Sequence, residues 1–106
     1  MYTHKKSLGQ HFLKDENVIQ KIIAVLKEET FTNLLEVGPG AGALTKHLMN
    51  LPAINFKAVE LDEEKVVYLS KKYPALGDKI IHQNFLDLEK PFDESFTVIG
   101  NFPYNI

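Results

Sequence analysis

Leu34-Leu35-Glu36-Val37-Gly38-Pro39-Gly40-Ala41-Gly42 is the stretch that decides the fold of this chain. Its apolar beginning predicts a buried strand over residues 34–37, and its glycines predict a tight turn. Leu44, Leu48 and Leu51 then recur at the spacing of one helix face. A strand, a glycine-rich turn and a helix in this order are typical of the start of a nucleotide-binding α/β unit.

The spacing of the glycines limits the classes of ligand that this turn is expected to bind. Gly-x-Gly-x-Gly is shorter than the dinucleotide-binding pattern Gly-x-Gly-x-x-Gly, and no Lys-Ser or Lys-Thr follows it as a phosphate-binding P-loop requires. Pyrophosphate is therefore a poor candidate.

The same alternation of strands and helices continues on both sides of this stretch. Asp15 is expected to cap a helix over residues 16–27, and Asp62 a helix that ends before Pro74. Further strands are expected over residues 56–60, 80–84 and 96–100. Short connections between alternating elements favour a parallel sheet.

Each predicted strand ends in a residue that can meet a ligand. These residues are Gly38, Glu60, Asn84 and Asn101. In an open parallel sheet the binding crevice lies outside the carboxyl ends of the strands, and an acidic residue about 20 positions after the glycines accepts hydrogen bonds from ribose. Glu60 meets this description, 22 residues past Gly38.

The last strand runs into Asn101-Phe102-Pro103-Tyr104. The Asn side chain offers an amide oxygen as acceptor, the Pro fixes the backbone without an N–H, and the Tyr offers a flat face for a nucleobase. Together these groups predict a pocket for a planar amine.

Composition limits the possible classes. The 106 residues fit one domain, and the 44% of hydrophobic and 25% of charged residues are those of a folded globular protein. There is no cysteine, no apolar run of about 18 residues and no metal-ligand spacing of histidines. All twelve basic residues are Lys, so bidentate phosphate clamps by Arg are excluded in this chain. We expect a cytoplasmic location, no membrane and no metal.

Three motifs carry a family resemblance. Glu36 to Gly42, Val59-Glu60-Leu61-Asp62 and Asn101 to Tyr104 resemble the successive motifs of S-adenosylmethionine-dependent adenine-N6 methyltransferases that act on ribosomal RNA. The opening Lys6-Ser7-Leu8-Gly9-Gln10-His11-Phe12-Leu13 is similar to that of the small-subunit rRNA adenine dimethyltransferases. Two alternatives stay open: a large-subunit methyltransferase of the macrolide-resistance type, and a non-catalytic ribosome-assembly or RNA-binding module.

The resemblance implies a role for each matching residue. His11 and Leu13 would border the cofactor S-adenosylmethionine, and Glu60 would hold its ribose. Asn84, where the family commonly has Asp, would accept from its adenine amino group. The glycines Gly38, Gly40 and Gly42 would face its methionine part. The target base would be met by Asn101, Phe102, Pro103 and Tyr104, with Asn101 also touching the cofactor.

The resemblance also implies a Rossmann-like class I methyltransferase fold, of which this chain would be the amino-terminal half with four parallel strands in the order 3-2-1-4. Residues 1–14 would form an N-terminal motif segment and residues 15–106 the cofactor-binding units. The rest of the catalytic domain and a C-terminal helical domain would be missing. The implied partner is small-subunit rRNA in an immature ribosomal subunit. We expect the full enzyme to be monomeric, and the fragment alone to be inactive and prone to self-association along its uncovered fourth strand.

Overall fold

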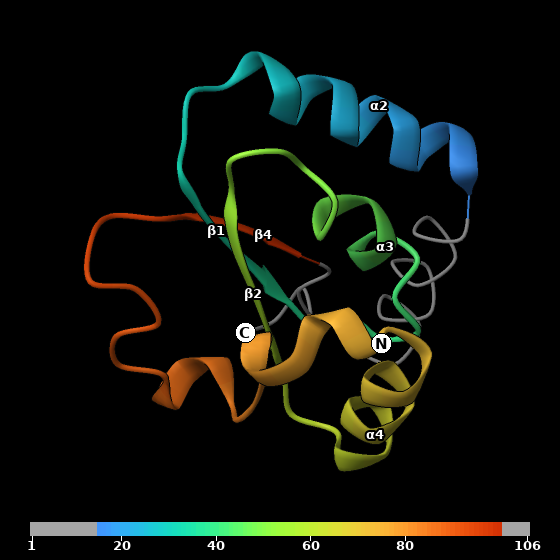
Figure 1. The fold of residues 1–106 in the computed structure, drawn as a ribbon, viewed down its shortest axis with the longest axis vertical. Helices are drawn as coiled ribbons and strands as arrows, with labels where there is room; N and C mark the ends of the chain where they lie inside the picture. The colour runs from blue at the N-terminus through green and yellow to red at the C-terminus, as the bar shows by residue number, and fades with distance from the viewer. Residues whose placement is uncertain (1–14, 101–106) are drawn as a thin grey trace, which may run out of the picture.

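A four-stranded parallel sheet forms the centre of the protein (Figure 1). The computed structural model describes residues 15–100. The strands are β1 (Asn33–Val37), β2 (Asn55–Glu60), β3 (Ile80–His82) and β4 (Thr97–Gly100). Their order is β3-β2-β1-β4 and every pairing is parallel, so the predicted order 3-2-1-4 is confirmed.

Within residues 15–100, one α-helix precedes the first strand, and two further α-helices and two short 3-10 helices connect the strands. They are α2 (Glu16–Glu28), α3 (Thr45–Leu48), α4 (Glu63–Lys72), η1 (Pro74–Lys79) and η2 (Phe85–Asp87). Both predicted caps are confirmed: the Asp15 carboxylate accepts from the backbone N–H groups of Asn17 and Val18, and the Asp62 carboxylate accepts from that of Glu64. The helix after the glycine turn is shorter than its leucine pattern suggests, because Leu51 lies beyond its end.

The sheet buries its two faces against different partners. One face packs against α2 and α3, with Ile19 and Leu48 of these helices in one cluster with Leu34 and Phe56 of the sheet. In Figure 1, α2 (blue) lies along the outside of α3 (green). On the other face the buried side chains are those of Leu35, Val37, Val59 and Phe92. Residues on a strand alternate between faces, so neighbours in sequence reach opposite clusters.

Two strand boundaries differ from the prediction. The third strand ends at His82 rather than at Asn84, because the Asn84 side-chain oxygen accepts from the N–H of Leu86 and caps η2 instead. The fourth begins at Thr97, one residue later than predicted.

Strand β4 is an edge strand within the described residues. It pairs with β1 alone there, and the Val98 side chain is 38% exposed. The sequence predicts that the fourth strand is the uncovered one, and β4 has this position. Self-association through β4 stays a prediction.

Gly100 allows β4 to approach β1 closely, and this predicts a stability effect. A Cβ atom there would overlap the Val37 carbonyl oxygen and lie 2.9 Å from the Val37 nitrogen. We expect Gly100→Ala to lower the free energy of unfolding by about 2 kcal/mol, measured by urea denaturation, since β1 cannot yield without loosening the sheet.

A comparison variant is Gly77→Ala in η1. Gly77 has a φ of 53° and a ψ of −127°, and a Cβ there would meet no atom of the described residues within 4 Å. Its substitution should cost backbone strain of about 1–3 kcal/mol without a steric clash. Unchanged stability in Gly100→Ala would contradict the close approach of β4 to β1.

Candidate functional site

The glycine turn after β1 is built from left-handed backbone. Gly38, Gly40 and Gly42 have φ values of 70°, 59° and 88°. The Gly38 N–H donates to the carbonyl of Val59 at 2.9 Å, which extends the β1–β2 pairing by one bond beyond the strand. The turn therefore stays attached to the end of β2.

Gly40 and Gly42 are glycines for different reasons. A Cβ at Gly42 would come within 2.8 Å of a ring carbon of Tyr73 and 2.9 Å of Leu69 Cδ2, so α4 and the residue that follows it pack directly on the turn. A Cβ at Gly40 would meet no atom of the described residues within 4 Å. Gly40 therefore leaves open space beside its backbone, as a ligand that approaches the main chain requires.

Glu60 ties this turn to the start of α4. Its side chain is buried at the carboxyl end of β2. Oε1 accepts from the Gly40 N–H at 3.2 Å, and Oε2 accepts from the Asp62 N–H at 3.0 Å. A carboxylate oxygen can accept more than one hydrogen bond, so Glu60 keeps capacity for hydroxyl groups of a ligand.

Asn84 lies close to Glu60 although it is outside a strand. The N–H of its neighbour Gln83 donates to the Glu60 backbone carbonyl at 3.1 Å. The Asn84 side chain is half-buried, and its oxygen accepts from the Leu86 N–H at 2.9 Å, which leaves one further lone pair. The structure thus brings four predicted site residues together at the carboxyl ends of the strands: Gly38, Gly40, Glu60 and Asn84.

Glu36 also lies in this region, although the sequence analysis did not include it among the candidate site residues. The carboxyl is 1% exposed, and it accepts a 2.6 Å hydrogen bond from Thr45 Oγ1 at the start of α3. Burial raises the pKa of Glu36 to about 7; the Thr45 hydrogen bond opposes this shift, and the negative charge of Glu60 adds to it. The signal available in the sequence was an acidic residue inside an otherwise apolar strand.

Six predicted site residues lie outside the described part of the chain. They are His11, Leu13, Asn101, Phe102, Pro103 and Tyr104. Their roles stay predictions.

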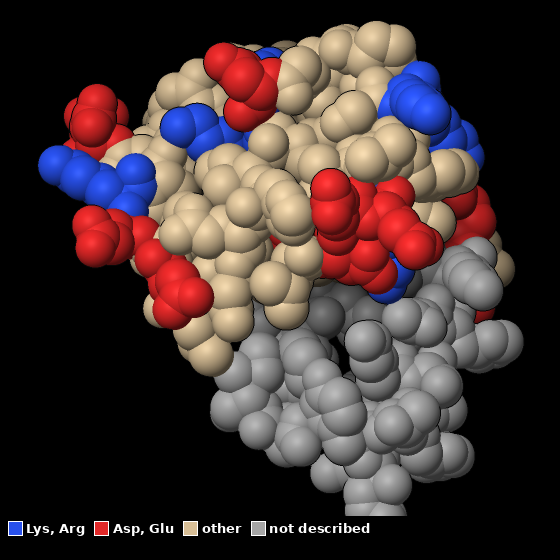
Figure 2. All heavy atoms as spheres, turned by 90° about the horizontal axis from the view of Figure 1, so that it is seen from below, with Lys and Arg blue, Asp and Glu red and all other residues tan. Residues whose placement is uncertain are grey.

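Acidic side chains gather on the face that includes the start of α4 (Figure 2). Glu63 and Glu64 are exposed in the first turn of this helix. Within residues 15–100, no three His, Cys, Asp or Glu side chains are grouped to hold a metal ion. No helix in that same range is long and apolar enough to cross a membrane.

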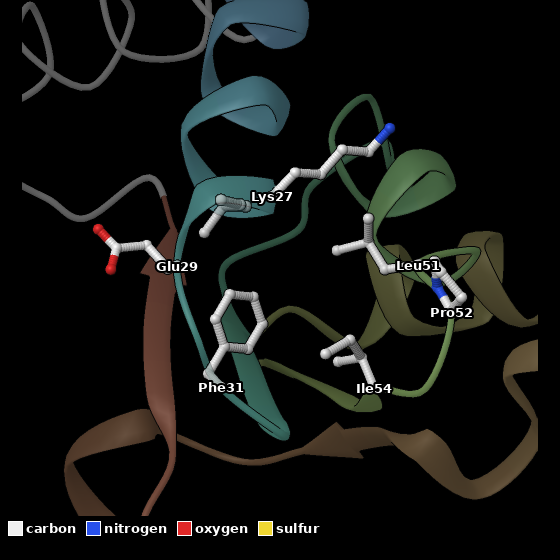
Figure 3. A pocket seen from close by; sticks show the side chains of 7 residues that line it. Lys27, Glu29, Phe31, Leu51, Pro52 and Ile54 are labelled. Atoms are coloured by element: carbon white, nitrogen blue, oxygen red, sulfur yellow. The ribbon is translucent and has the colours of Figure 1, made fainter.

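A separate hollow lies at the opposite end of the sheet (Figure 3). Phe31 from the segment before β1, and Leu51 and Ile54 from the segment before β2, supply much of its apolar lining. In Figure 3 the Glu29 carboxylate points away from these side chains. Since it adjoins the amino ends of the strands, this hollow is distinct from the edge that carries Gly40 and Glu60.

An open parallel sheet in the order 3-2-1-4, flanked by helices and with a glycine turn after its first strand, defines a Rossmann-like domain of the methyltransferase class. The family model described as ribosomal RNA adenine dimethylase matches residues 1–106, and the chain belongs to this family.

The names of curated relatives agree with this family assignment. The protein from Flavobacterium johnsoniae is 47% identical over an alignment of 105 residues that covers 96% of this chain and 40% of that protein. The relative from Cytophaga hutchinsonii is 44% identical over 96% of this chain and 41% of its own length, and that from Parabacteroides distasonis 49% identical over 96% and 39%. All three are called ribosomal RNA small subunit methyltransferase A. The chain thus spans about two fifths of the length of these relatives.

The buried Glu36 carboxyl predicts a pH-dependent stability. An unfolded Glu loses its proton near pH 4.5 and the folded Glu36 near pH 7, so the folded state holds more protons in between. Stability should therefore fall as pH rises from about 4.5 to about 7, by up to roughly 3 kcal/mol, and then level off.

Urea unfolding at pH 5 and pH 8 measures this contribution. The wild type should lose more stability across the interval than Glu36→Gln, which has no proton to lose. Glu63→Gln, at an exposed site, is the matched control and should follow the wild type. Parallel losses in the wild type and Glu36→Gln would show that Glu36 ionises with an ordinary pKa.

Proposed function

We propose that the protein carrying this chain uses S-adenosylmethionine to dimethylate N6 of adenines in small-subunit rRNA, as part of ribosome maturation in the cytoplasm. Membership of the rRNA adenine dimethylase family and the names of the relatives support the reaction class. The structural observation that carries the proposal is the Glu60 carboxylate, fixed by the Gly40 and Asp62 N–H groups beside open backbone.

The described residues fit a nucleoside cofactor. Glu60 would accept hydrogen bonds from the ribose hydroxyls, and Asn84 would accept from the adenine amino group. The open side of Gly40 would admit the methionine part, with Gly38 and Gly42 shaping the turn around it. His11 and Leu13 would complete the border. When bound, the cofactor supplies a methyl group activated by its sulfonium.

The target adenine would be held by the motif at residues 101–104. The Asn101 side-chain oxygen and the Phe102 carbonyl would accept from the N6 amine, so that its lone pair points at the methyl group. The cofactor would supply the methyl group to this amine, and the amine would give up its proton to water. Tyr104 would stack on the flipped base, and Pro103 would fix the backbone between them. Positioning and electrostatic complementarity would supply most of the rate enhancement.

The substrate would be rRNA in the immature small subunit rather than large-subunit rRNA. The small-subunit names of the relatives and Ser7-Leu8-Gly9 before Gln10 favour this choice over the macrolide-resistance type. The intact Asn101 to Tyr104 motif, together with Glu60, favours an enzyme over a non-catalytic assembly module. We propose that residues 1–106 are the cofactor-binding part of a larger monomeric enzyme.

Transfer of labelled methyl groups to unmethylated small ribosomal subunits tests the function. The full-length protein should label them, and large subunits should stay unlabelled. Asn101→Ala should slow transfer at least a hundredfold, since it removes an acceptor that acts on the reacting amine. Wild-type rates in Asn101→Ala would exclude this role, and the absence of any transfer by the wild-type protein would exclude the function.

Cofactor binding tests Glu60 separately. Glu60→Gln should weaken the affinity for S-adenosylmethionine about tenfold to a hundredfold in calorimetry, because hydrogen bonds to a charged group are worth about 1.5–3 kcal/mol. Glu64→Gln, an exposed acidic residue four positions along the chain, is the matched control and should bind as the wild type does. Equal affinity in both variants would remove Glu60 from the site.

A further inference from the structure

Lys57 is a charged residue on a largely apolar face of the sheet. In the register of the strands it lies opposite Leu35 of β1, and Val98 of β4 lies opposite Leu35 on the other side. Register partners point to the same face, so the half-buried Lys57 lies on the face where Leu35 and Val59 are buried. Strands of a parallel sheet are normally apolar on both faces. A Lys in the middle of β2 is therefore an exception that its contacts have to explain.

The contacts of Lys57 are to the connection that leads into β4. Residues 88–96, all of them described, form this connection without a helix. Phe92 in its middle is 9% exposed and belongs to the cluster on the same face of the sheet. The Lys57 Nζ donates to the Pro91 carbonyl and lies 4.9 Å from the centroid of the Phe92 ring. Both contacts hold the connection to β2, and the attraction of a cation to a ring is stronger where water is excluded.

From this anchored point the connection continues directly into β4. The rings of Phe92 and Phe96 lie with their centroids 5.5 Å apart, and Phe96 is the residue before the strand. At the same end, the Asn33 side chain at the start of β1 donates to the Ser95 carbonyl at 3.0 Å. Lys57 and Asn33 thus attach the connection to β2 and to β1, and together they set where β4 begins.

The position of β4 matters because of the residue that follows it. Gly100 ends the strand, and Asn101 is next in the sequence. Consecutive Cα atoms are about 3.8 Å apart, so a shift of β4 moves the first residue of the target-base motif with it. This inference rests on the proposed function, in which Asn101 meets the reacting amine. We propose that Lys57 is a positioning residue for methyl transfer, which anchors the connection 88–96 and so fixes the point from which the target-base motif begins.

The chemistry of Lys explains why an apolar residue would not serve here. Apolar contacts are non-directional, so they would keep the connection on the sheet without fixing its place along it. The Lys57 ammonium instead requires the Pro91 carbonyl and the Phe92 ring at defined distances. Its methylene stem still covers apolar surface, as long basic side chains do. Loss of the ammonium should therefore affect the placement of β4 more than the stability of the sheet.

Lys57→Met in the full-length protein tests this role. Met keeps an unbranched apolar stem and removes both the donor and the cation. The single-turnover rate of methyl transfer to unmethylated small subunits, at saturating cofactor, should fall about tenfold, because small displacements of reacting groups have large effects on rate. The affinity for S-adenosylmethionine in calorimetry should fall by a smaller factor, because Gly40 and Glu60 are held by their own hydrogen bond.

Three further variants separate positioning from a general loss of stability. Lys90→Met, at an exposed Lys beside Pro91, is the matched control and should keep the wild-type rate. Ala24→Gly in α2 lowers the stability at an exposed helical site and should also keep the rate. Lys57→Arg retains a donor and a cation for the ring, so it should restore most of the rate that Lys57→Met loses.

A wild-type rate in Lys57→Met would overturn the inference. Equal falls in rate and in cofactor affinity would do the same, as would a lack of restoration in Lys57→Arg. If Lys57→Met does not fold, Phe92→Leu gives a second readout, because it keeps an apolar side chain and removes the ring that contacts both Lys57 and Phe96. It should slow transfer in the same way, and an unchanged rate would count against the anchor.

Failure of this inference is distinguishable from failure of the proposed function. A wild-type protein that methylates small subunits, with Lys57→Met equally fast, keeps the function and loses only the role of Lys57. A wild-type protein that transfers no methyl group overturns both.

Discussion

Parallel pairing of β1 with a strand on each side is the constraint on which the rest of the structure depends. All five residues of β1 are buried, and its register is fixed to β2 and to β4 at once. A strand enclosed in this way cannot shift by one residue without moving its side chains to the opposite face. The position of the glycine turn that follows is thereby fixed relative to both neighbours.

Glu60 links two neighbouring strand–helix units at the carboxyl ends of β1 and β2. One carboxylate oxygen accepts from the turn after β1 and the other from the first residues after β2, so a single side chain joins two successive strand–helix units. Both bonds are made by backbone N–H groups, which of all substitutions only one by proline would remove. In its proposed role as a ligand acceptor, Glu60 would be oriented before binding, which would lower the entropy lost on binding.

The sequence predicts the elements whose signals are local and repeated. The strands follow from short apolar runs, the caps at Asp15 and Asp62 and the position of Glu60 follow from residue spacing, and the strand order agrees with the family resemblance. Asn84 was harder to place, because a side chain that can cap a 3-10 helix competes with continuation of the strand, and spacing alone does not decide between them. The Glu36–Thr45 hydrogen bond depends on how α3 packs against the sheet. This packing is a tertiary property that residue spacing does not reveal.

The contact of α4 with the glycine turn has a consequence for natural sequence variation. Gly42 has no room for a side chain because Leu69 and Tyr73 already occupy the space beside it. A larger residue at position 42 is compatible with this packing only if the side chains at positions 69 and 73 shrink or turn away, and its backbone must still adopt a positive φ. Position 42 lies more than 25 residues before positions 69 and 73, yet the three should vary in concert across the family rather than independently.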